Sequence, residues 1–404
     1  MAITLLSLSL PASAIERRQN QFLNEESYMF VPLPYSIPGI GQGVMFTGLA
    51  GNALGTYTDL YLLAITGDAS GQILGLEDIH LVDETLIFNY FYQGLNKASV
   101  QMYEARGMDT QKDDFQFIVL DKVTGTDTNL WLTLWERRIE AYIGRWSQGV
   151  GVTAINDAEG NLLASYDESY TFENQTNYYG LRLDYTDDRQ NPFAGVRLEA
   201  LRTSSPPSND LQPDYYVVTK SASAYIPIGK ASTFAFHHRV SDAIVNREGE
   251  TDPLAIAAEQ GVTCNDADAA CLAAVESLTA TTAAERKYGT AEDLGGQNRL
   301  RAYPQSRFKG AHSLYQSAEL RLTLFDEVTP FNFWIWKDVS TGIQLALFYE
   351  QGAASDDASE LTSKLRTSNG AGIRMVSGSG YVYRFDLAQG DEGSQTTVMF
   401  AYPW

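Results

Sequence analysis

The sequence has 404 residues, of which 44% are hydrophobic, 12% aromatic and 20% charged, and its formal net charge is −21. The excess of 50 acidic over 29 basic residues argues against nucleic-acid binding, because contacts to phosphates need cationic patches. No run of about 20 uninterrupted apolar residues occurs, which argues against a helical membrane protein.

Residues 1–14 are predicted to be an export signal. A short apolar stretch ends in Pro11-Ala12-Ser13-Ala14, which is similar to an Ala-x-Ala cleavage site, so we expect cleavage after Ala14. No Lys or Arg precedes the apolar stretch, and both an upstream start and a merely apolar N-terminus stay open. Residues 15–38 are then expected to form a short periplasmic segment, because fewer than about 30 residues are too few for an independent domain.

Alternating apolar and polar residues fill most of the region from 39 to 404. In residues 318–324, leucines occupy one face and Glu319, Arg321 and Thr323 the other, and this period of two predicts strands. Gly, Asp, Asn and Ser separate such segments. About sixteen strands are predicted, at residues 41–51, 56–66, 85–93, 98–106, 115–122, 128–136, 139–148, 178–185, 195–203, 215–227, 231–240, 314–325, 341–351, 370–377, 381–388 and 396–404.

The alternation fits both a soluble sandwich and a transmembrane barrel, which differ in the face that is apolar. Three features favour the barrel: the export signal, Tyr and Trp near strand ends, and the end of the chain, where Val398, Phe400, Tyr402 and Trp404 alternate as in a sorting strand of outer-membrane proteins. A globular edge strand is the alternative for that segment. We predict an all-β fold, a transmembrane antiparallel β-barrel of about 16 strands over residues 39–404 in the bacterial outer membrane.

The first and last predicted strands are expected to meet in a weak lateral seam. Gly41 and Gly43 weaken packing on the first strand, and Pro403, beside Trp404, removes a ladder donor on the last. Ordinary glycines in a barrel wall are the open alternative.

Residues 242–312 form the longest predicted connection and lie on the outer surface, because five strands follow them and the last strand ends in the periplasm. Cys264 and Cys271 within it are predicted to form one small-loop disulfide in an exported protein. The Ala-rich residues 267–276 predict a short external helix, which either caps the barrel, meets a partner or is solvated decoration.

The end of this loop holds the segment Leu300-Arg301-Ala302-Tyr303. We expect the loop to fold back into the lumen, where a guanidinium can pair at two points with a carboxylate. In the predicted strand 341–351 the parity directs Phe348 and Glu350 inward, so Arg301 with Glu350 is the first-choice pair. Arg384 and Asp386 also share the inward parity, and a solvated Arg301 is the alternative.

These segments resemble the BamA, TamA and FhaC superfamily, whose sixth loop reads apolar-Arg-Gly-aromatic. Leu300, Arg301 and Tyr303 match, and Ala302 departs from the glycine, at a cost of about 1 kcal/mol if the backbone there needs a positive φ. The spacing of Asp187, Arg189 and Pro192, before Gly195, is similar to the family's Asp-x-Arg-x-x-Pro turn. Residues 348–352 look like its Phe-x-Asp-x-Gly strand with Glu350 for Asp, and residues 383–388 resemble its penultimate strand, so the resemblance covers most of residues 178–404.

The resemblance implies an outer-membrane insertase or translocase for protein or lipid. Members of the superfamily usually carry periplasmic POTRA domains, and none is expected here. We therefore expect separate periplasmic or lipoprotein subunits as partners and outer-membrane lipid or lipopolysaccharide around the barrel. A role as the membrane anchor of a larger complex is a variant of this expectation. A cation-favouring solute channel and a purely structural barrel are the alternatives. No enzyme activity, cofactor or metal is expected, since neither Gly-x-Ser-x-Gly nor His-Glu-x-x-His occurs.

Overall fold

The computed structural model describes residues 15–22, 25–229, 232–259, 269–326, 331–333, 336–339, 341–377, 382–400 and 402–404. The predicted export signal and Cys264 lie outside these ranges. Cleavage after Ala14 and the pairing of Cys264 with Cys271 therefore stay predictions.

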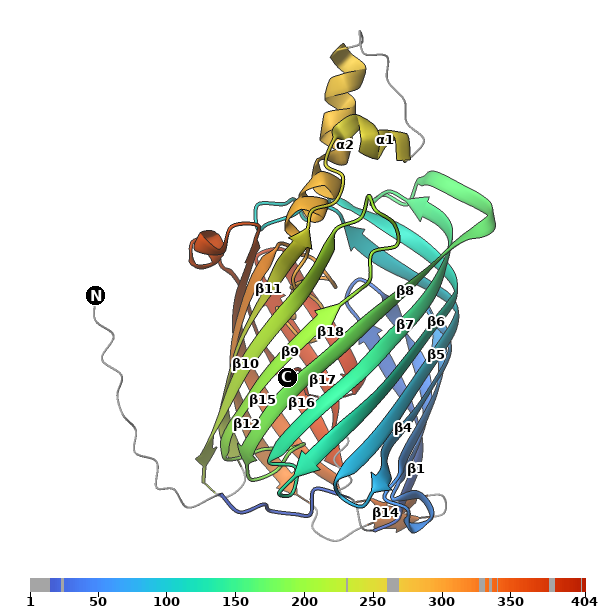
Figure 1. Cartoon of the computed structure of the whole chain (residues 1–404). Helices are drawn as coiled ribbons and strands as arrows, with labels where there is room; N and C mark the ends of the chain where they lie inside the picture. Colours follow the sequence, from blue (N-terminus) through green and yellow to red (C-terminus); the bar gives the residue numbers. More distant parts are fainter. Residues whose placement is uncertain are drawn as a thin grey trace, which may run out of the picture.

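Sixteen long strands form a closed antiparallel barrel (Figure 1), which confirms the predicted fold. Each strand from β1 to β12 pairs with the next, β12 pairs with β15, and β15 to β18 continue the order until β18 meets β1. The strands are β1 Ser27–Ile37, β2 Gly41–Gly51, β3 Asp59–Gly67, β4 Ser70–Val82, β5 Leu86–Tyr103, β6 Phe115–Leu134, β7 Ile139–Asn156, β8 Leu162–Thr186, β9 Gly195–Ser204, β10 Asp214–Ile228, β11 Ser232–Arg247, β12 His312–Asp326, β15 Thr341–Ser355, β16 Arg366–Ser377, β17 Val382–Gly390 and β18 Gly393–Phe400.

The remaining elements lie at the two ends of the barrel. The short strands β13 (Phe331–Phe333) and β14 (Trp336–Val339) pair with each other between β12 and β15, at what we call the turn end. The helices α1 (Pro253–Glu259) and α2 (Ala269–Tyr288) rise above the opposite end, the loop end (Figure 1). Single 3-10 turns occupy Ala53–Gly55 and Ala358–Thr362. The predicted Ala-rich helix is therefore present and extends to Tyr288.

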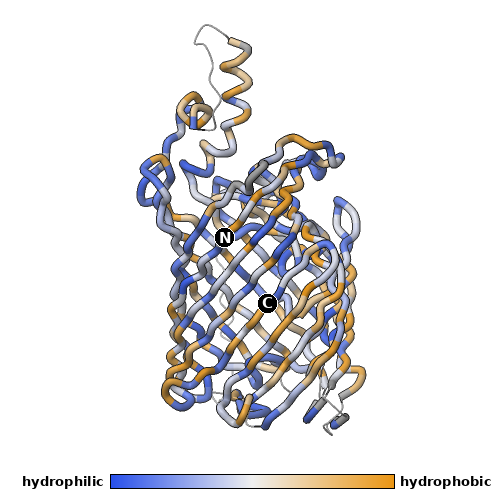
Figure 2. Tube along the Cα trace, turned by 90° about the vertical axis from the view of Figure 1, so that its right-hand side faces the viewer, coloured by the Kyte–Doolittle hydropathy of each residue, from blue (hydrophilic) through white to orange (hydrophobic). Residues whose placement is uncertain are grey.

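The wall of the barrel is apolar outside and polar inside. On β15, Leu347 and Tyr349 are 44% and 48% exposed, whereas Gln344 and Glu350 are buried in the interior. The same alternation runs along the other strands, where hydrophobic and hydrophilic residues succeed each other (Figure 2). An apolar exterior around a charged interior is the arrangement that a barrel embedded in lipid requires. None of the helices in the described part of the chain has the length and apolar character to cross a membrane.

The predicted number of strands is correct although four assignments were wrong. β1 and β4 were not predicted, and β5 and β6 were each predicted as two strands. Bulges explain the splitting, because Lys122 takes a φ of 47° and the register of β6 against β7 shifts between Asp121 and Thr124, which interrupts the alternation.

The barrel begins at Ser27 and not at residue 39, so the predicted periplasmic segment 15–38 contains a wall strand. Two prolines in β1, Pro32 and Pro34, obscured it, since proline in a strand indicates an edge or a non-strand segment. Residues 15–22 precede this strand and lie at the turn end.

Candidate functional site

A hairpin from the long loop between β11 and β12 enters the lumen. Leu294 and Phe308 exchange two backbone hydrogen bonds of 2.9 Å at its base. Gly295 takes a φ of +107°, and a Cβ there would lie 2.2 Å from the carbonyl oxygen of Pro304, so this tight turn needs glycine. The hairpin carries the predicted Leu300–Tyr303 motif into the interior, where Arg301 and Tyr303 are fully buried.

Arg301 contacts three carboxylates on three strands. Its backbone N–H and its Nε donate to the two oxygens of Glu350, each at 2.8 Å. Its Nη1 donates to Asp386 at 2.8 Å and its Nη2 to Glu319 at 3.2 Å. The guanidinium also lies 3.4 Å from the ring centroid of Phe348. The structure thus brings together Arg301, Glu350, Phe348 and Asp386, as the sequence pattern indicated, and adds Glu319.

Three further arginines complete this group, which we call the lumen network: Arg301, Arg321, Arg374, Arg384, Glu319, Glu350 and Asp386. Arg321 and Arg374 donate to Glu319 at 2.7 and 2.8 Å, and Arg384 donates to Asp386 at 2.8 Å. All seven side chains are at most 1% exposed. The network therefore ties the hairpin to β12, β15, β16 and β17 at once.

Sequence reasoning placed Glu319 and Arg321 on a polar face without assigning them contacts, and it missed Arg374. The available signal was the inward parity of Arg374 opposite Arg384 on the neighbouring strand. A second signal was Gly372, where a Cβ would lie 1.9 Å from a carboxylate oxygen of Asp386. Glycine at that position makes room for the acid.

Ala302, which stands where the resembled motif has glycine, causes no backbone strain. The chain takes a positive φ at Leu300, of 50°, and not at Ala302. The methyl group of Ala302 instead lies against Gly390, where an added Cβ would be 2.9 Å away. Its N–H donates to Ser368 at 3.1 Å, and the neighbouring Tyr303 hydroxyl donates to the Thr367 carbonyl at 3.1 Å.

Other ion pairs hold the loop at the loop end. Arg307 donates to both carboxylate oxygens of Glu392 in the turn between β17 and β18, at 2.9 and 2.7 Å. Arg239 on β11 donates twice to Glu292, at 2.6 Å each. Burial alone would raise the pKa of the Glu292 carboxyl, but Arg239 and, to a smaller extent, Arg299 outweigh this effect and lower the pKa below its ordinary value. The carboxylate is therefore held in its charged form.

The predicted mid-barrel turn lies between β8 and β9 at the turn end. Asp187 accepts from the backbone N–H groups of Phe193 and Ala194 at 2.8 and 3.0 Å, and Arg189 lies 3.3 Å from Glu140. Gly195 takes a φ of +112°, and a Cβ there would lie 2.1 Å from the Tyr185 carbonyl. The turn is thus fixed by its own acid and glycine. Pro192 faces the lumen as part of a cavity wall.

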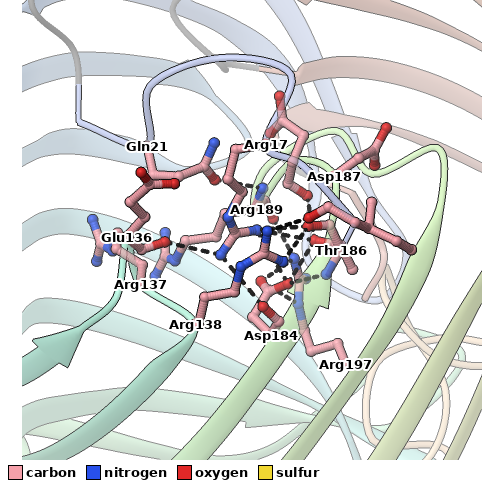
Figure 3. Close-up of polar contacts among 12 residues, drawn as sticks. Arg17, Gln21, Glu136, Arg137, Arg138, Asp184, Thr186, Asp187, Arg189 and Arg197 are labelled. Carbon is pink, nitrogen blue, oxygen red and sulfur yellow. Dashed lines mark hydrogen bonds and ion pairs between the residues drawn. The ribbon is translucent and has the colours of Figure 1, made fainter. Parts of the chain in front are cut away.

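Residues 15–22 are tied to this turn. Figure 3 shows Arg17 directed at Asp184 and Thr186, with which it makes contacts of 3.4 Å and 3.1 Å. Arg18 donates to Asp187 at 2.7 Å, and the Arg189 N–H donates to Gln21 at 2.9 Å. The segment before β1 therefore lies against the barrel mouth at the turn end.

The seam between β1 and β18 is short. All 11 residues of β1 pair with β2, whereas within the described chain Ser36 with Val398 is the ladder pair that joins β1 to β18. The carbonyl of Pro34 accepts from the Tyr383 hydroxyl at 2.6 Å, so the backbone groups of Pro32, Pro34 and Ser36 face this seam. Proline has no N–H to donate.

These positions correct the predicted seam residues. Gly41 and Gly43 lie on β2, one strand away from the seam. Described strand pairing of β18 ends at Phe400, so Pro403 is not a ladder position. Trp404 does not belong to the seam either, since its ring stacks on that of His237 on β11, with ring centroids 5.0 Å apart. The chain end at mid-height of the barrel in Figures 1 and 2 agrees with this.

No group of three or more His, Cys, Asp or Glu side chains in the described part of the chain is arranged to hold a metal ion.

No protein-family model and no curated protein matches the sequence. Among solved structures, the barrel is similar to BamA from Haemophilus ducreyi lacking POTRA domains 1–3, with a TM-score of 0.46 and 12% identity over 95% of this chain and 75% of that one. It is also similar to CdiB from Escherichia coli, with a TM-score of 0.49 and 13% identity over 94% of this chain and 68% of that one.

Proposed function

We propose that this chain is an outer-membrane barrel of the BamA, TamA and FhaC superfamily that works in the insertion or translocation of protein or lipid. The observation that carries the proposal is the seam, where Ser36 with Val398 is the one ladder pair between β1 and β18 among the described residues, while two prolines face the same edge. A route from the lumen into the bilayer needs two neighbouring strands to separate.

Separation at this seam breaks little. A backbone hydrogen bond contributes about 0.5–1.5 kcal/mol net, so a wall contact with many ladder pairs is far more costly to open than one with a single pair. Leu33, Tyr35 and Met45 on β1 and β2 form an apolar cluster, against which Tyr383 and Phe400 pack. Apolar packing of this kind is not directional, so it tolerates sliding of the two strands better than a ladder of hydrogen bonds does.

The hairpin supports the same proposal by holding the part of the wall next to β18. Because the lumen network joins β12, β15, β16 and β17 through Arg301, these strands stay fixed when the seam opens. The superfamily resemblance of the motif thus has a structural counterpart in this chain.

For orientation, we propose that the turn end faces the periplasm and that the loop end with α1 and α2 faces outward, as is usual for barrels with short periplasmic turns and long outer loops. The exposed apolar exterior would then lie in outer-membrane lipid. Separate periplasmic or lipoprotein subunits would deliver substrate to the turn end. Affinity purification from native membranes is expected to recover such a subunit, and repeated isolation of the barrel alone would contradict that part.

A steady solute channel is supported less well. The hairpin 294–308 and residues 402–404 occupy the interior, and residues 15–22 lie against the mouth at the turn end. Planar-bilayer recordings are therefore expected to show small and irregular conductance. A large, steady, cation-favouring conductance would favour the channel.

A cysteine staple across the seam tests the main proposal. Ser36→Cys with Val398→Cys places two thiols on directly paired residues, where Cβ atoms are close enough to bridge. Assayed in liposomes for insertion of an unfolded barrel protein, the stapled form is expected to fall to the rate of protein-free liposomes and to recover on reduction.

The matched control staples the neighbouring pair, Ser36→Cys with Gln42→Cys, which joins β1 to β2. This variant carries the same substitution on β1 and the same chemistry and is expected to retain full activity. Full activity of the seam-stapled form under oxidising conditions would overturn the proposal.

A further inference from the structure

Three basic side chains form a row on the outer face of the barrel wall: Arg202 on β9, Lys220 on β10 and His238 on β11. Arg202 pairs with Val218 and His238 with Ala222, so each lies diagonally beside Lys220. Diagonal neighbours of this kind are about 7–8 Å apart, a distance that long side chains can span. A ligand lying over β10 is therefore within reach of Lys220 and of both its neighbours.

The row follows the circumference of the barrel. In Figure 1 the strands lean to the right toward the loop end, and β11 lies to the left of β9. From β9 to β11 the row moves two residues toward the turn end on each strand, which offsets this inclination. The three side chains therefore lie at a similar depth in the membrane.

The row also marks the end of an apolar zone on the wall. Arg202 and Lys220 are the first polar side chains on the outer face of β9 and β10, counted from the turn end. The outward positions before them are Val196, Leu198 and Ala200 on β9 and Ile226, Ala224 and Ala222 on β10. A charge on the lipid face is costly at the midplane and tolerated near the interface, so the pattern indicates that the row lies at headgroup depth.

Among the described residues, no acid pairs with Arg202 or with the exposed Lys220. Arg202 donates to the Tyr179 hydroxyl at 2.8 Å. The neighbouring acid, Asp242, is instead hydrogen-bonded to His312 at 2.7 Å. In a chain with a net charge of −21, two adjacent cations without an acid favour an anion from outside the protein.

His238 adds a hydrogen-bond donor to this row. Gln351 Nε2 donates to Gln316 Oε1 at 2.6 Å, and Gln316 Nε2 donates to His238 Nδ1 at 3.0 Å. Since Nδ1 accepts, the neutral ring carries its proton on Nε2, and this N–H has no partner within the described chain. The ring is exposed on the lipid face, where a donor without an acceptor is costly.

A hollow of about 490 Å³ in the outer wall begins at His238. Ala222, Ala224 and Ala318 line it, and the larger Leu198 and Phe236, which are 48% and 41% exposed, stand beside them. The residues that line this hollow include no acid. An apolar hollow next to basic side chains at headgroup depth suits the acyl chain of a lipid whose headgroup is anionic.

We propose that the outer face of β9, β10 and β11 is a binding site for an anionic phospholipid. The phosphate of the headgroup lies between Arg202, Lys220 and the His238 Nε2–H, and one acyl chain lies in the alanine hollow. The site is across the barrel from the β1–β18 seam, so the inference does not depend on insertion or translocation at that seam.

Native mass spectrometry of the full chain, in detergent with equimolar phosphatidylglycerol and phosphatidylcholine, tests the proposal. We expect phosphatidylglycerol to be retained with at least about a tenfold preference. Arg202→Gln with Lys220→Gln should abolish this preference. The matched control, Lys112→Gln with Lys287→Gln, removes two exposed charges away from the wall and should keep it.

A second substitution tests the hollow without changing any charge. Ala222→Leu fills it and is expected to weaken retention of phosphatidylglycerol by at least about threefold. Ala64→Leu, at an exposed alanine on the lipid face of β3, is its control and should change nothing. This variant keeps the test valid if the double glutamine variant does not fold.

Three results would overturn the proposal. They are equal retention of the two lipids by the parent, retention unchanged by Arg202→Gln with Lys220→Gln or by Ala222→Leu, and a protein dimer that Ala222→Leu abolishes. The last result would assign this face to a second copy of the chain.

Discussion

The lumen network and the β1–β18 seam are two regions of one barrel that differ strongly in the number of bonds that hold them together. In the network, Arg301 alone makes four hydrogen bonds to three acids, and every member is buried. At the seam, one ladder pair and two side-chain hydrogen bonds, from Tyr383 to Pro34 and from Ser36 to Thr396, are the polar contacts between the described residues of β1 and of β17 and β18. The difference indicates that rigidity and the capacity to open are placed in different parts of the wall.

The largest expected effect comes from breaking the network. Arg301→Ala leaves Glu350, Glu319 and Asp386 short of a buried partner, and we expect a loss of about 3–5 kcal/mol in the free energy of unfolding. Urea titration of the folded barrel in detergent measures it. Lys112→Ala, at an exposed lysine in the connection between β5 and β6, is the control and should stay within about 0.5 kcal/mol of the parent. Similar stability of the two variants would contradict the role of the network.

A methyl group added beside the hairpin tests whether the close packing of the hairpin against β17 stabilises the barrel. Gly390→Ala adds a Cβ at 2.9 Å from that of Ala302 and at 3.0 Å from the ring of Tyr303. We expect a destabilisation of about 1–3 kcal/mol, because the neighbours are buried and cannot move freely. Gly393→Ala, where an added Cβ meets nothing within 4 Å, controls for insertion of a methyl group near the same turn. Because Gly393 takes a positive φ and its Ala variant carries backbone strain, a second control is Gly48→Ala on β2, where no positive φ is needed and the nearest atoms lie 3.9 Å from an added Cβ. Equal losses in Gly390→Ala and Gly48→Ala would refute the packing argument.

Strengthening the seam should have a moderate effect of opposite sign. Pro32→Val with Pro34→Val supplies two backbone donors on the edge that faces β18, and we expect a gain of about 1 kcal/mol for each bond formed. The same variant should insert client proteins more slowly. Phe30→Val, on the same strand, adds no donor and serves as the control. Unchanged stability and unchanged insertion in the double variant would show that proline does not limit the seam.

The smallest effect is expected at the departure from the family pattern. Ala302→Gly restores the glycine of the resembled motif, but the backbone there does not take a positive φ. The substitution should therefore destabilise the barrel by about 0.5–1 kcal/mol through chain entropy. A gain in stability would mean that the loop favours the glycine conformation after all.

The inside-out alternation was predictable from sequence because strand parity alone decides which face a residue occupies. The same parity placed Glu350, Arg384 and Asp386 in the lumen, and the motif placed Arg301 near them. Parity says nothing about height along the barrel or position around it. The sequence therefore could not predict that Glu319 accepts hydrogen bonds from Arg301, Arg321 and Arg374 at once.

Two sequence predictions were wrong for the same reason, because the segments concerned depart from regular strand pairing. β1 was missed because its prolines look like a loop, although they mark the edge that makes the seam weak. Trp404 was predicted to belong to the last strand because the alternation continues in the sequence after the last described ladder pair of β18, at Phe400. Its stacking on His237 depends on strands far away in the chain, which local periodicity cannot reveal.

Hydrogen exchange of the native barrel in nanodiscs, read by mass spectrometry, compares the two regions directly. Amides of β18 at the seam are expected to exchange at least about tenfold faster than those of β16, which is paired on both sides and tied to the lumen network through Arg374. Equal protection of β18 and β16 would contradict the account.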